Sequence, residues 1–315
     1  MGRSIASVAM ASGRERVLSA SPLQASVDVF NGVKVDCGSL DGQVDSAAFA
    51  TLLSDSLRQW EKEGRSGCWL FIPSEKSHLV SAAVQQGFDF HHAKPGVVAM
   101  TKWLLDTPNM IPSYPFTQVG VGAVIFDESD QTLLTVVEKN GPLKGKGVYK
   151  IPTGSADPGE HIGRAAEREV WEETGLKARF ERLLLFRHRL GGTNCDLFFV
   201  CALKLDSSGG KEKQEIVVDE SELEDAKFMN IKDYFGQSIW ADIKVYKDHI
   251  NPVISSYTRG QYTGLAHHVR EDERYGKHAV YTAPAAVAAS QQARPLPLLR
   301  PIRSSLNFLR RLVRP

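Results

Sequence analysis

The sequence predicts an α/β protein with two domains, and three observations support this. Its 315 residues are enough for two ordinary domains, and a content of 42% hydrophobic and 24% charged residues is typical of soluble globular proteins. Short apolar runs that suit strands alternate with segments whose apolar residues recur at helical spacing. Three prolines, Pro108, Pro112 and Pro115, lie close together, and we place a linker at residues 108–115.

The first domain is predicted at residues 28–107. A helix is expected where five apolar residues recur at helical spacing and Gly64 can end the run; these residues are Phe49, Leu52, Leu53, Leu57 and Trp60. The apolar run 68–72 predicts a buried strand that stops before Pro73. A second helix is expected near 77–86, and further strands near 88–91 and 97–103.

The second domain is predicted at residues 116–258. Apolar runs predict strands in two groups, one before and one after a long polar helix: 119–126, 133–137 and 148–151, then 183–186, 197–203, 216–218 and 226–229. Two short helices are expected near 232–235 and 242–250. The helix between the two groups of strands carries the most informative part of the sequence.

That helix lies in the stretch GSADPGEHIGRAAEREVWEETGL, from Gly154 to Leu176. Pro158-Gly159 is a turn pair, and residues 161–174 are good helix formers that end at Gly175, where a C-terminal cap belongs. Glu169, Glu172 and Glu173 stand at i, i+3 and i+4, so their carboxylates share one face of the helix. Ala165, Ala166 and Val170 lie on the other face, which we expect to pack on a sheet.

Three clustered carboxylates repel one another unless a cation neutralises them. Arg168 is one candidate cation, and a divalent metal ion is another. Oxygen ligands without His or Cys nearby favour Mg²⁺ or Mn²⁺ over zinc. A metal ion held here would bridge the phosphate oxygens of a substrate, withdraw charge as the P–O bond breaks and orient an attacking water. The sequence therefore predicts hydrolysis of a pyrophosphate linkage.

The same stretch resembles the Nudix box at every defined position; the matching residues are Gly154, Glu160, Arg168, Glu169, Val170, Glu172, Glu173, Gly175 and Leu176. The resemblance implies an enzyme, a Nudix pyrophosphohydrolase acting on phosphorus-containing anhydrides. It also implies a fold, an α/β/α sandwich around a mixed sheet.

The resemblance further implies roles for individual residues. Glu169 and Glu173 would ligate the metal directly, Glu172 would be a further ligand or a base, and the Gly154 carbonyl a backbone ligand. Arg168 would hold the glutamate side chains by charge-assisted hydrogen bonds. Glu160 would take part in catalysis in a way that differs among family members.

Two cations outside the box are candidates for binding substrate phosphates. Lys150 precedes the box loop, and Arg187 ends a predicted strand. A solvent-exposed position without a role in the site remains open for both.

The first domain also resembles a known region. The stretches FNGVKVDCGSL, SLRQWEKEGRSGCWLFIP, QQGFDFHHAKPGVVAMTKWL and QVGVGAVIF are similar to the pre-Nudix region of plant ADP-ribose and NADH pyrophosphatases and of the animal growth-factor-antisense Nudix protein. The resemblance covers residues 30–251. It implies that the first domain is a small α/β unit similar to a truncated acetyltransferase, and it suggests ADP-ribose, NADH or both as substrates, cleaved with release of AMP.

Other functions remain open from the sequence. The chain could be a nucleotide-sensing regulatory or binding protein, although such a module does not need the complete set of glutamates. It could also be a Nudix enzyme that acts on capped RNA, CoA or inositol pyrophosphates. Sequence markers of the NADH, ADP-ribose and dinucleoside-polyphosphate subfamilies are missing beyond Leu176, because no proline lies between Pro158 and Pro252 and no tyrosine between Tyr149 and Tyr234. Specificity in this superfamily comes from loops outside the box.

The two ends of the chain carry their own predictions. Residues 1–27 are expected to be a disordered tail or a transit peptide, because they contain Arg3, Arg14 and Arg16 but one acid. The location is therefore cytoplasmic, or mitochondrial or chloroplast if that segment is a transit peptide. Residues 259–315 are predicted to be a low-order basic tail. Its six final arginines leave contact with nucleic acid or a membrane open, and a homodimer is possible.

Overall fold

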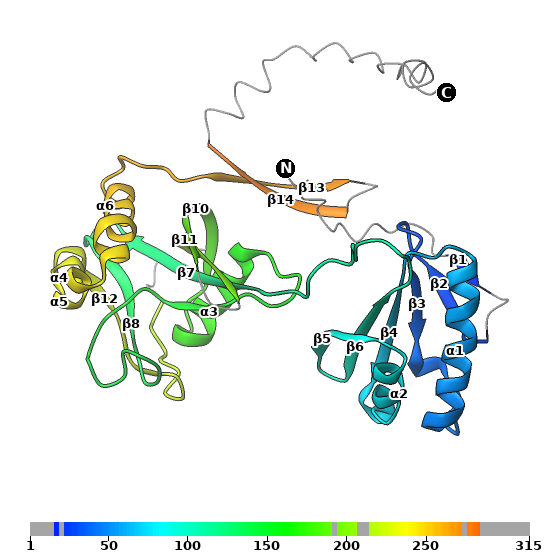
Figure 1. Ribbon diagram of the computed structural model, residues 1–315. Coiled ribbons are helices and arrows are strands. Elements are labelled where there is room, and N and C mark those ends of the chain that lie inside the picture. Colours follow the sequence, from blue (N-terminus) through cyan, green and yellow to red (C-terminus); the bar gives the residue numbers. More distant parts are fainter. Residues whose placement is uncertain (1–15, 19–21, 191–193, 207–213, 273–275, 284–315) are drawn as a thin grey trace, which may run out of the picture. The chain divides into compact units, whose positions relative to one another are not determined.

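The computed structural model describes residues 16–18, 22–190, 194–206, 214–272 and 276–283 (Figure 1). The chain divides into two compact units at Thr117 and Gln118. The first unit also includes the described residues of 271–278, and the second comprises the described residues of 118–270 and 279–283. Within the described part of the chain, no helix is long and apolar enough to span a membrane.

The first unit contains a six-stranded sheet in the order β1-β2-β3-β4-β6-β5. Its strands are β1 (Arg16–Leu18), β2 (Ala25–Val27), β3 (Val33–Asp36), β4 (Gly67–Pro73), β5 (Asp89–Lys94) and β6 (Val97–Trp103). Strands β3 and β4 are parallel, whereas the other neighbours are antiparallel. Short 3₁₀ turns follow β3 and β4, at Cys37–Ser39 and Ser74–Lys76.

Two helices in this unit, α1 (Ser46–Lys62) and α2 (Leu79–Gln85), pack against each other and against one face of the sheet. The Asp45 side chain begins α1 by accepting a hydrogen bond from the Ala48 N–H, and Gly64 follows its end with a φ of 69°. The apolar residues of α1 that the sequence places on one face are the ones that enter the core. The predicted α/β character of this unit is confirmed, with α2 shorter than expected.

The second unit is built on a sheet with the strand order β10-β11-β7-β8-β12, and β9 pairs with β7. The strands are β7 (Thr117–Asp127), β8 (Thr132–Glu138), β9 (Thr153–Ser155), β10 (Ala178–Arg189), β11 (Cys195–Leu205) and β12 (Leu223–Asn230). The long strand β7 pairs with β9 near its start and with β8 at its end, where Phe126 lies opposite Leu133. It therefore links the two halves of the sheet.

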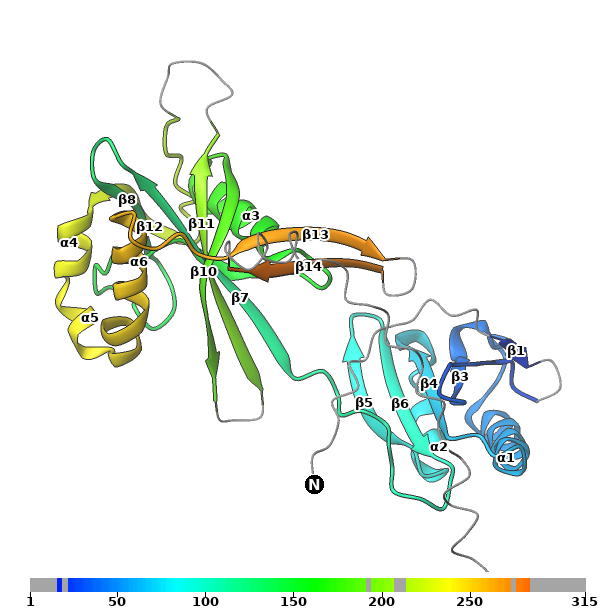
Figure 2. The ribbon, with the colours of Figure 1, turned by 90° about the horizontal axis from the view of Figure 1, so that it is seen from above.

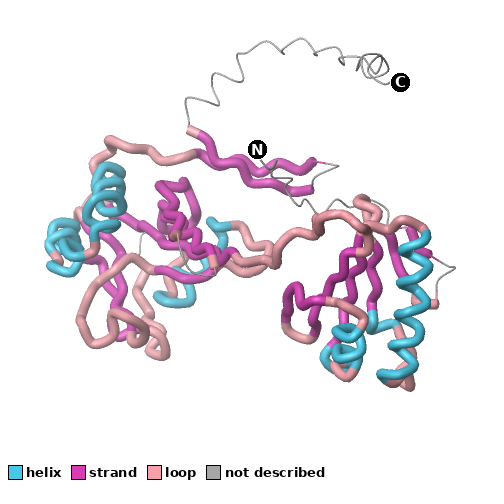
Figure 3. The backbone as a smooth tube through the Cα atoms, in the orientation of Figure 1, coloured by secondary structure: helices cyan, strands magenta, loops and turns pink. Residues whose placement is uncertain are grey.

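Helices cover both faces of this sheet (Figures 2 and 3). Helix α3 (Ile162–Thr174) packs on the face to which Val121, Ala123 and Cys201 point. The other face, with Val124 and Val200, is covered by a second group of helices: α4 (Ile231–Gly236), α5 (Ser238–Asp242), a π-helical turn at Tyr246–Ile250, and α6 (Asn251–Thr258). Successive side chains of β7 and β11 thus point to opposite faces of the sheet and pack in two separate apolar cores. The predicted α/β/α sandwich is confirmed.

Three predicted elements differ in the structure. Residues 148–151 do not form a strand, and Lys150 makes a single bridge to Val136. Residues 216–218 are also not a strand, because their backbone instead meets the end of α3, where the Val217 N–H donates to the Thr174 carbonyl at 2.9 Å. The expected helix at 242–250 is interrupted at Ile243: α5 ends at Asp242, and the rest leads through the π-helical turn at Tyr246–Ile250 into α6.

The ends of the chain also differ from the sequence prediction. The predicted low-order tail, 259–315, contains a two-stranded hairpin of β13 (Ala266–Asp272) and β14 (Gly276–Thr282). The predicted tail 1–27 includes β1 and β2. Both segments form strands because each strand pairs with another one. Local composition does not reveal such a pairing. Residues 1–15 and the arginine-rich end, 284–315, lie outside the described residues.

Candidate active site

Helix α3 begins and ends at defined caps. The His161 ring accepts a hydrogen bond from the Gly163 N–H through Nδ1 at 3.1 Å, and Gly175 ends the helix with a φ of 69°. Ala165, Ala166 and Val170 are buried against the sheet. The opposite face therefore presents the charged side chains of the box, as the sequence predicts, and the observed helix starts one residue later than expected.

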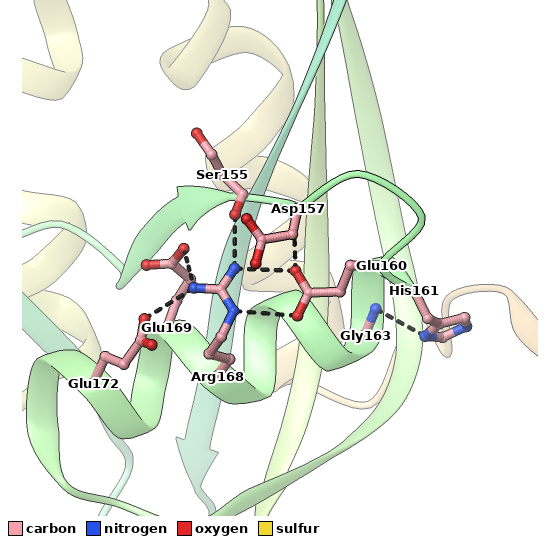
Figure 4. A network of polar contacts seen from close by, with 8 residues as sticks. All are labelled: Ser155, Asp157, Glu160, His161, Gly163, Arg168, Glu169 and Glu172. Atoms are coloured by element: carbon pink, nitrogen blue, oxygen red, sulfur yellow. Dashed lines mark hydrogen bonds and ion pairs between the residues drawn. The ribbon is translucent and has the colours of Figure 1, made fainter. Parts of the chain in front are cut away.

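Arg168 is the centre of an ion-pair network on that face (Figure 4). Its Nε and Nη2 atoms donate to the two carboxylate oxygens of Glu160 at 3.1 and 3.0 Å. Its Nη1 donates to Glu169 at 3.0 Å and to Glu172 at 2.9 Å, while Nη2 also reaches the Ser155 carbonyl at 2.8 Å. The guanidinium thus joins the loop before α3 to three carboxylates.

These contacts shift the acidity of the groups involved. Hydrogen bonds from Arg168 are the main cause that lowers the pKa of Glu160, and the carboxylates in turn raise the pKa of Arg168. The pKa of Glu169 is raised, because burial outweighs the opposing hydrogen bonds from Arg168. Arg168 therefore holds Glu160 firmly ionised.

Glu173 differs from the other glutamates because it is buried, with an exposed fraction of 4%. Burial raises its pKa to about 8; Lys150 opposes this effect, and the neighbouring carboxylates Glu169, Glu222 and Glu138 add to it. Its Oε2 atom has no hydrogen-bond partner among the described residues. A buried carboxylate oxygen without a partner is costly unless a cation joins it.

The loop that precedes α3 approaches these side chains closely at Gly154. A Cβ atom added at Gly154 would overlap the carboxylate of Glu169. Only glycine lets the backbone of β9 come so near to this carboxylate. Gly154 and the Glu169 carboxylate, both predicted to hold a metal ion, are therefore next to each other.

Lys150 lies beside this group of carboxylates. It is 9% exposed, its Nζ is 2.7 Å from Glu138 Oε1, and it contacts the Thr153 hydroxyl. Because it also lowers the pKa of Glu173, its charge acts on the site. The structure thus places Lys150 at the site rather than on a solvent-exposed face.

Arg187 lies near the end of β10, beside Phe198, on the face of the sheet that α4, α5 and α6 cover. Its Nη2 contacts both carboxylate oxygens of Asp196, at 3.0 and 3.1 Å, and its guanidinium lies 5.2 Å from the centre of the Phe198 ring. The Phe198 ring in turn packs on β7, where a Cβ at Gly122 would come within 2.8 Å of it. Arg187 also lines a cavity of about 640 Å³ together with Tyr262.

The residues present fit a divalent cation. All candidate ligands are oxygens, Glu173 has a buried oxygen without a partner among the described residues, and the Glu169 carboxylate packs against the backbone at Gly154. No three His, Cys, Asp or Glu side chains of the described chain already stand in metal-binding geometry. Arg168 makes ion pairs with Glu160, Glu169 and Glu172.

Several residues of this region were not predicted from the sequence. Glu138 and Glu222 act on Glu173 from β8 and from the turn before β12. Phe198 supports Arg187, and Tyr281 contacts the His161 ring from the C-terminal hairpin. No short motif marks these residues, since each one reaches the site through a long-range contact.

Comparisons with known proteins agree with this geometry. A family model described as "Nudix hydrolase domain" matches residues 23–104, and another described as "NUDIX domain" matches residues 116–249. Nudix hydrolase 8 of Arabidopsis thaliana is 35% identical over 79% of this chain and 65% of its own length. Nudix hydrolase 2 of the same plant is 33% identical over 76% of this chain and 82% of its own length.

A mouse protein named nucleoside diphosphate-linked moiety X motif 6 is 42% identical over 58% of this chain. The match spans 59% of the mouse protein, so this chain covers less than two thirds of Nudix hydrolase 8 and of the mouse relative. The resemblance to the Nudix box is confirmed by these matches, as is the resemblance to the plant and animal pre-Nudix proteins. The chain belongs to the Nudix hydrolase family.

Proposed function

We propose that the protein is a Mg²⁺- or Mn²⁺-dependent pyrophosphohydrolase that cleaves a nucleoside diphosphate linked to another moiety. Its substrates are ADP-ribose, NADH or both, and AMP is released. The observation that carries the proposal is the buried Glu173 with its unpartnered oxygen, close to Glu169, against which the backbone at Gly154 packs. A divalent cation bound by these oxygens would give the buried Glu173 oxygen a partner.

Glu169, Glu173, Glu172 and the Gly154 carbonyl would hold the metal. The bound ion supplies charge neutralisation for the pyrophosphate and a water of lowered pKa. Glu172, whose side chain is 46% exposed, would be either a further ligand or the base that takes a proton from the attacking water. Arg168 would fix the loop before α3 through its two hydrogen bonds with Glu160.

Lys150 and Arg187 would bind the rest of the substrate. Lys150 stands beside Glu173 with its charge shared with Glu138, which suits contact with a phosphate oxygen. Arg187 lines the cavity next to the π-helical turn, and Asp196 and Phe198 hold its guanidinium in place. A guanidinium held on two sides loses little side-chain entropy when a ligand binds.

The choice of ADP-ribose and NADH rests on the resemblance to plant and animal proteins of this family. The mouse relative's name refers to a nucleoside diphosphate-linked moiety, which is the same general class. The test is turnover with Mg²⁺ across ADP-ribose, NADH, CoA, diadenosine polyphosphates and capped RNA, with Glu173→Gln as control. A dominant rate on ADP-ribose or NADH is expected. Faster turnover of another compound would contradict the substrate, and no turnover would favour a nucleotide-binding protein.

Replacement of Arg187 by alanine is expected to raise KM about tenfold and to leave kcat within about twofold. A residue that binds a remote part of the substrate holds the ground state and the transition state equally. The matched control is Arg179→Ala, which also removes an ion pair with an aspartate at an edge of the sheet, Asp206 at 3.0 Å. The control should leave both constants unchanged. Steady-state kinetics with ADP-ribose measure kcat and KM of both variants. A fall in kcat alone would contradict this role of Arg187.

A further inference from the structure

The C-terminal hairpin is attached to the second unit at its start. Leu265 and Leu183 exchange two backbone hydrogen bonds, of 3.2 and 2.7 Å, so the chain joins β10 just before β13 begins. Gly264 allows this contact because its φ is 70° and a Cβ there would be 2.8 Å from the Leu183 carbonyl oxygen. The chain that enters the hairpin is therefore fixed on the sheet that carries α3.

Four rings form a cluster between the hairpin and the first turn of α3. Measured between ring centres, Phe180 of β10 lies 4.9 Å from His267 of β13. The His161 ring centre lies 5.7 Å from that of His267 and 6.0 Å from that of Tyr281 of β14. A Cβ added at Gly163 would overlap the Phe180 ring, so that ring lies directly against the start of α3. Tyr281 and Phe180 pack on the same apolar core as α3.

The hydrogen bonds of His161 fix the tautomer of its ring. The Gly163 backbone N–H can only donate, so Nδ1 of His161 must be an unprotonated acceptor. In the neutral ring the proton then resides on Nε2, which lies 2.9 Å from the Tyr281 hydroxyl. Nε2–H therefore donates to the Tyr281 oxygen. The Gly163 N–H thus selects the tautomer, and the Tyr281 hydroxyl, by accepting from Nε2–H, fixes the rotation of the ring.

We propose that Tyr281 is a positioning residue for the catalytic helix and acts through His161. His161 follows Glu160 directly, and the Glu160 carboxylate holds Arg168 by two hydrogen bonds. By fixing the His161 ring, the hairpin fixes the first turn of α3 and the loop that carries Glu160. The C-terminal hairpin, which lies outside the box in the sequence, thereby helps to position the site. The effect on turnover rests on the proposed hydrolysis, whereas the effect on the helix cap does not.

The test is hydrogen exchange of the Gly163 amide, measured by NMR on the full-length protein. Tyr281→Phe keeps the ring in the cluster and removes only the hydroxyl, and we expect exchange at Gly163 to become about three- to tenfold faster. Tyr262→Phe is the matched control, since it also removes one tyrosine hydroxyl hydrogen bond from this unit, to the Leu184 carbonyl at 2.7 Å. The control should leave Gly163 unchanged. Unchanged exchange in Tyr281→Phe would overturn the proposal.

A second background separates positioning from general packing. Asparagine at position 161 can cap the helix with its side-chain oxygen and without a ring. In His161→Asn protein, Tyr281→Phe should therefore change the exchange of Gly163 less than about twofold. An equal increase in both backgrounds would mean that Tyr281 acts by packing alone and would refute the role.

Turnover gives an independent readout. With ADP-ribose, Tyr281→Phe should lower kcat about three- to tenfold and leave KM within about twofold, because Glu160 and Arg168 are displaced rather than removed. A rise in KM at constant kcat would contradict positioning. A protein that hydrolyses none of the tested compounds would refute the proposed function, while the exchange measurement would still decide the role of Tyr281.

Discussion

Glu173→Gln is expected to remove metal-dependent turnover and to stabilise the metal-free protein. Glutamine has nearly the same shape as glutamate, so the buried side chain keeps its place, but it offers no negative charge to a cation. We expect kcat/KM to fall about 10³-fold, because a group that stabilises the transition state electrostatically is lost. Steady-state kinetics with Mg²⁺ measure this, and a variant with the wild-type rate would show that Glu173 is not a ligand.

The effect on stability has the opposite sign, because burial raises the pKa of Glu173 to about 8 in the folded protein from an ordinary value of 4.5. Between these two pH values the folded state binds more protons than the unfolded state. The free energy of unfolding therefore falls as pH rises from about 4.5 to about 8. Glutamine removes that loss, which is on the order of 4 kcal/mol at pH 8.

Urea unfolding with a chelator, at pH 5 and pH 8, measures this stability effect. The wild type should lose stability between the two pH values, and Glu173→Gln should lose much less. Glu224→Gln is the matched control, since it removes an exposed carboxylate on β12. Added Mg²⁺ should stabilise the wild type more than Glu173→Gln, because metal binding needs the deprotonated carboxylate. Parallel pH curves for wild type and Glu173→Gln would contradict the raised pKa.

The sequence predicts α1 and α3 well because their signals are local. Gly64 follows the end of α1 as predicted, and the box helix ends at Gly175 as its composition indicates. Apolar residues at helical spacing place one face of each helix in a core, and this depends only on the period of the helix. The same argument puts the three box glutamates on one surface.

The sequence does not predict what depends on distant contacts. Residues 148–151 have the composition of a strand, but their backbone makes one bridge to β8 and then leads into the box loop. The hairpin of β13 and β14 follows a segment with few local signals and forms where Leu265 meets β10. Strand formation depends on an available partner edge, which composition does not encode.

The candidate site shows the same division. Box spacing identifies Glu169 and Glu172 as neighbours, but it does not distinguish them from Glu173, whose burial comes from the surrounding strands. The pKa of Glu173 depends on Lys150 and on carboxylates from β8 and the turn before β12. Motif spacing thus names the candidate ligands, while the tertiary structure decides their protonation.

Gly154→Ala is expected to lower kcat/KM by about 10²-fold or more while leaving the fold nearly as stable. A Cβ at this position would overlap the Glu169 carboxylate, and φ of Gly154 lies outside the range that disfavours alanine. The end of a flexible glutamate side chain can move away, so the cost to stability should stay below about 1 kcal/mol. The Glu169 carboxylate, however, would leave its place against Gly154, and a displacement of about 1 Å at a reacting site can cost 10²-fold.

The matched control is Gly236→Ala, because an added Cβ there meets no atom within 4 Å and Gly236 also lies in the second unit. Both variants should unfold at nearly the wild-type urea concentration, and only Gly154→Ala should lose turnover. Weaker Mn²⁺ binding by Gly154→Ala, followed by electron paramagnetic resonance, would trace the loss to the metal ligands. Full activity would mean that Glu169 can leave its place beside Gly154 without consequence and would remove Glu169 from the metal site. Inactivity together with early unfolding would instead place the defect in the fold, since the backbone of β9 would then have moved in place of the side chain.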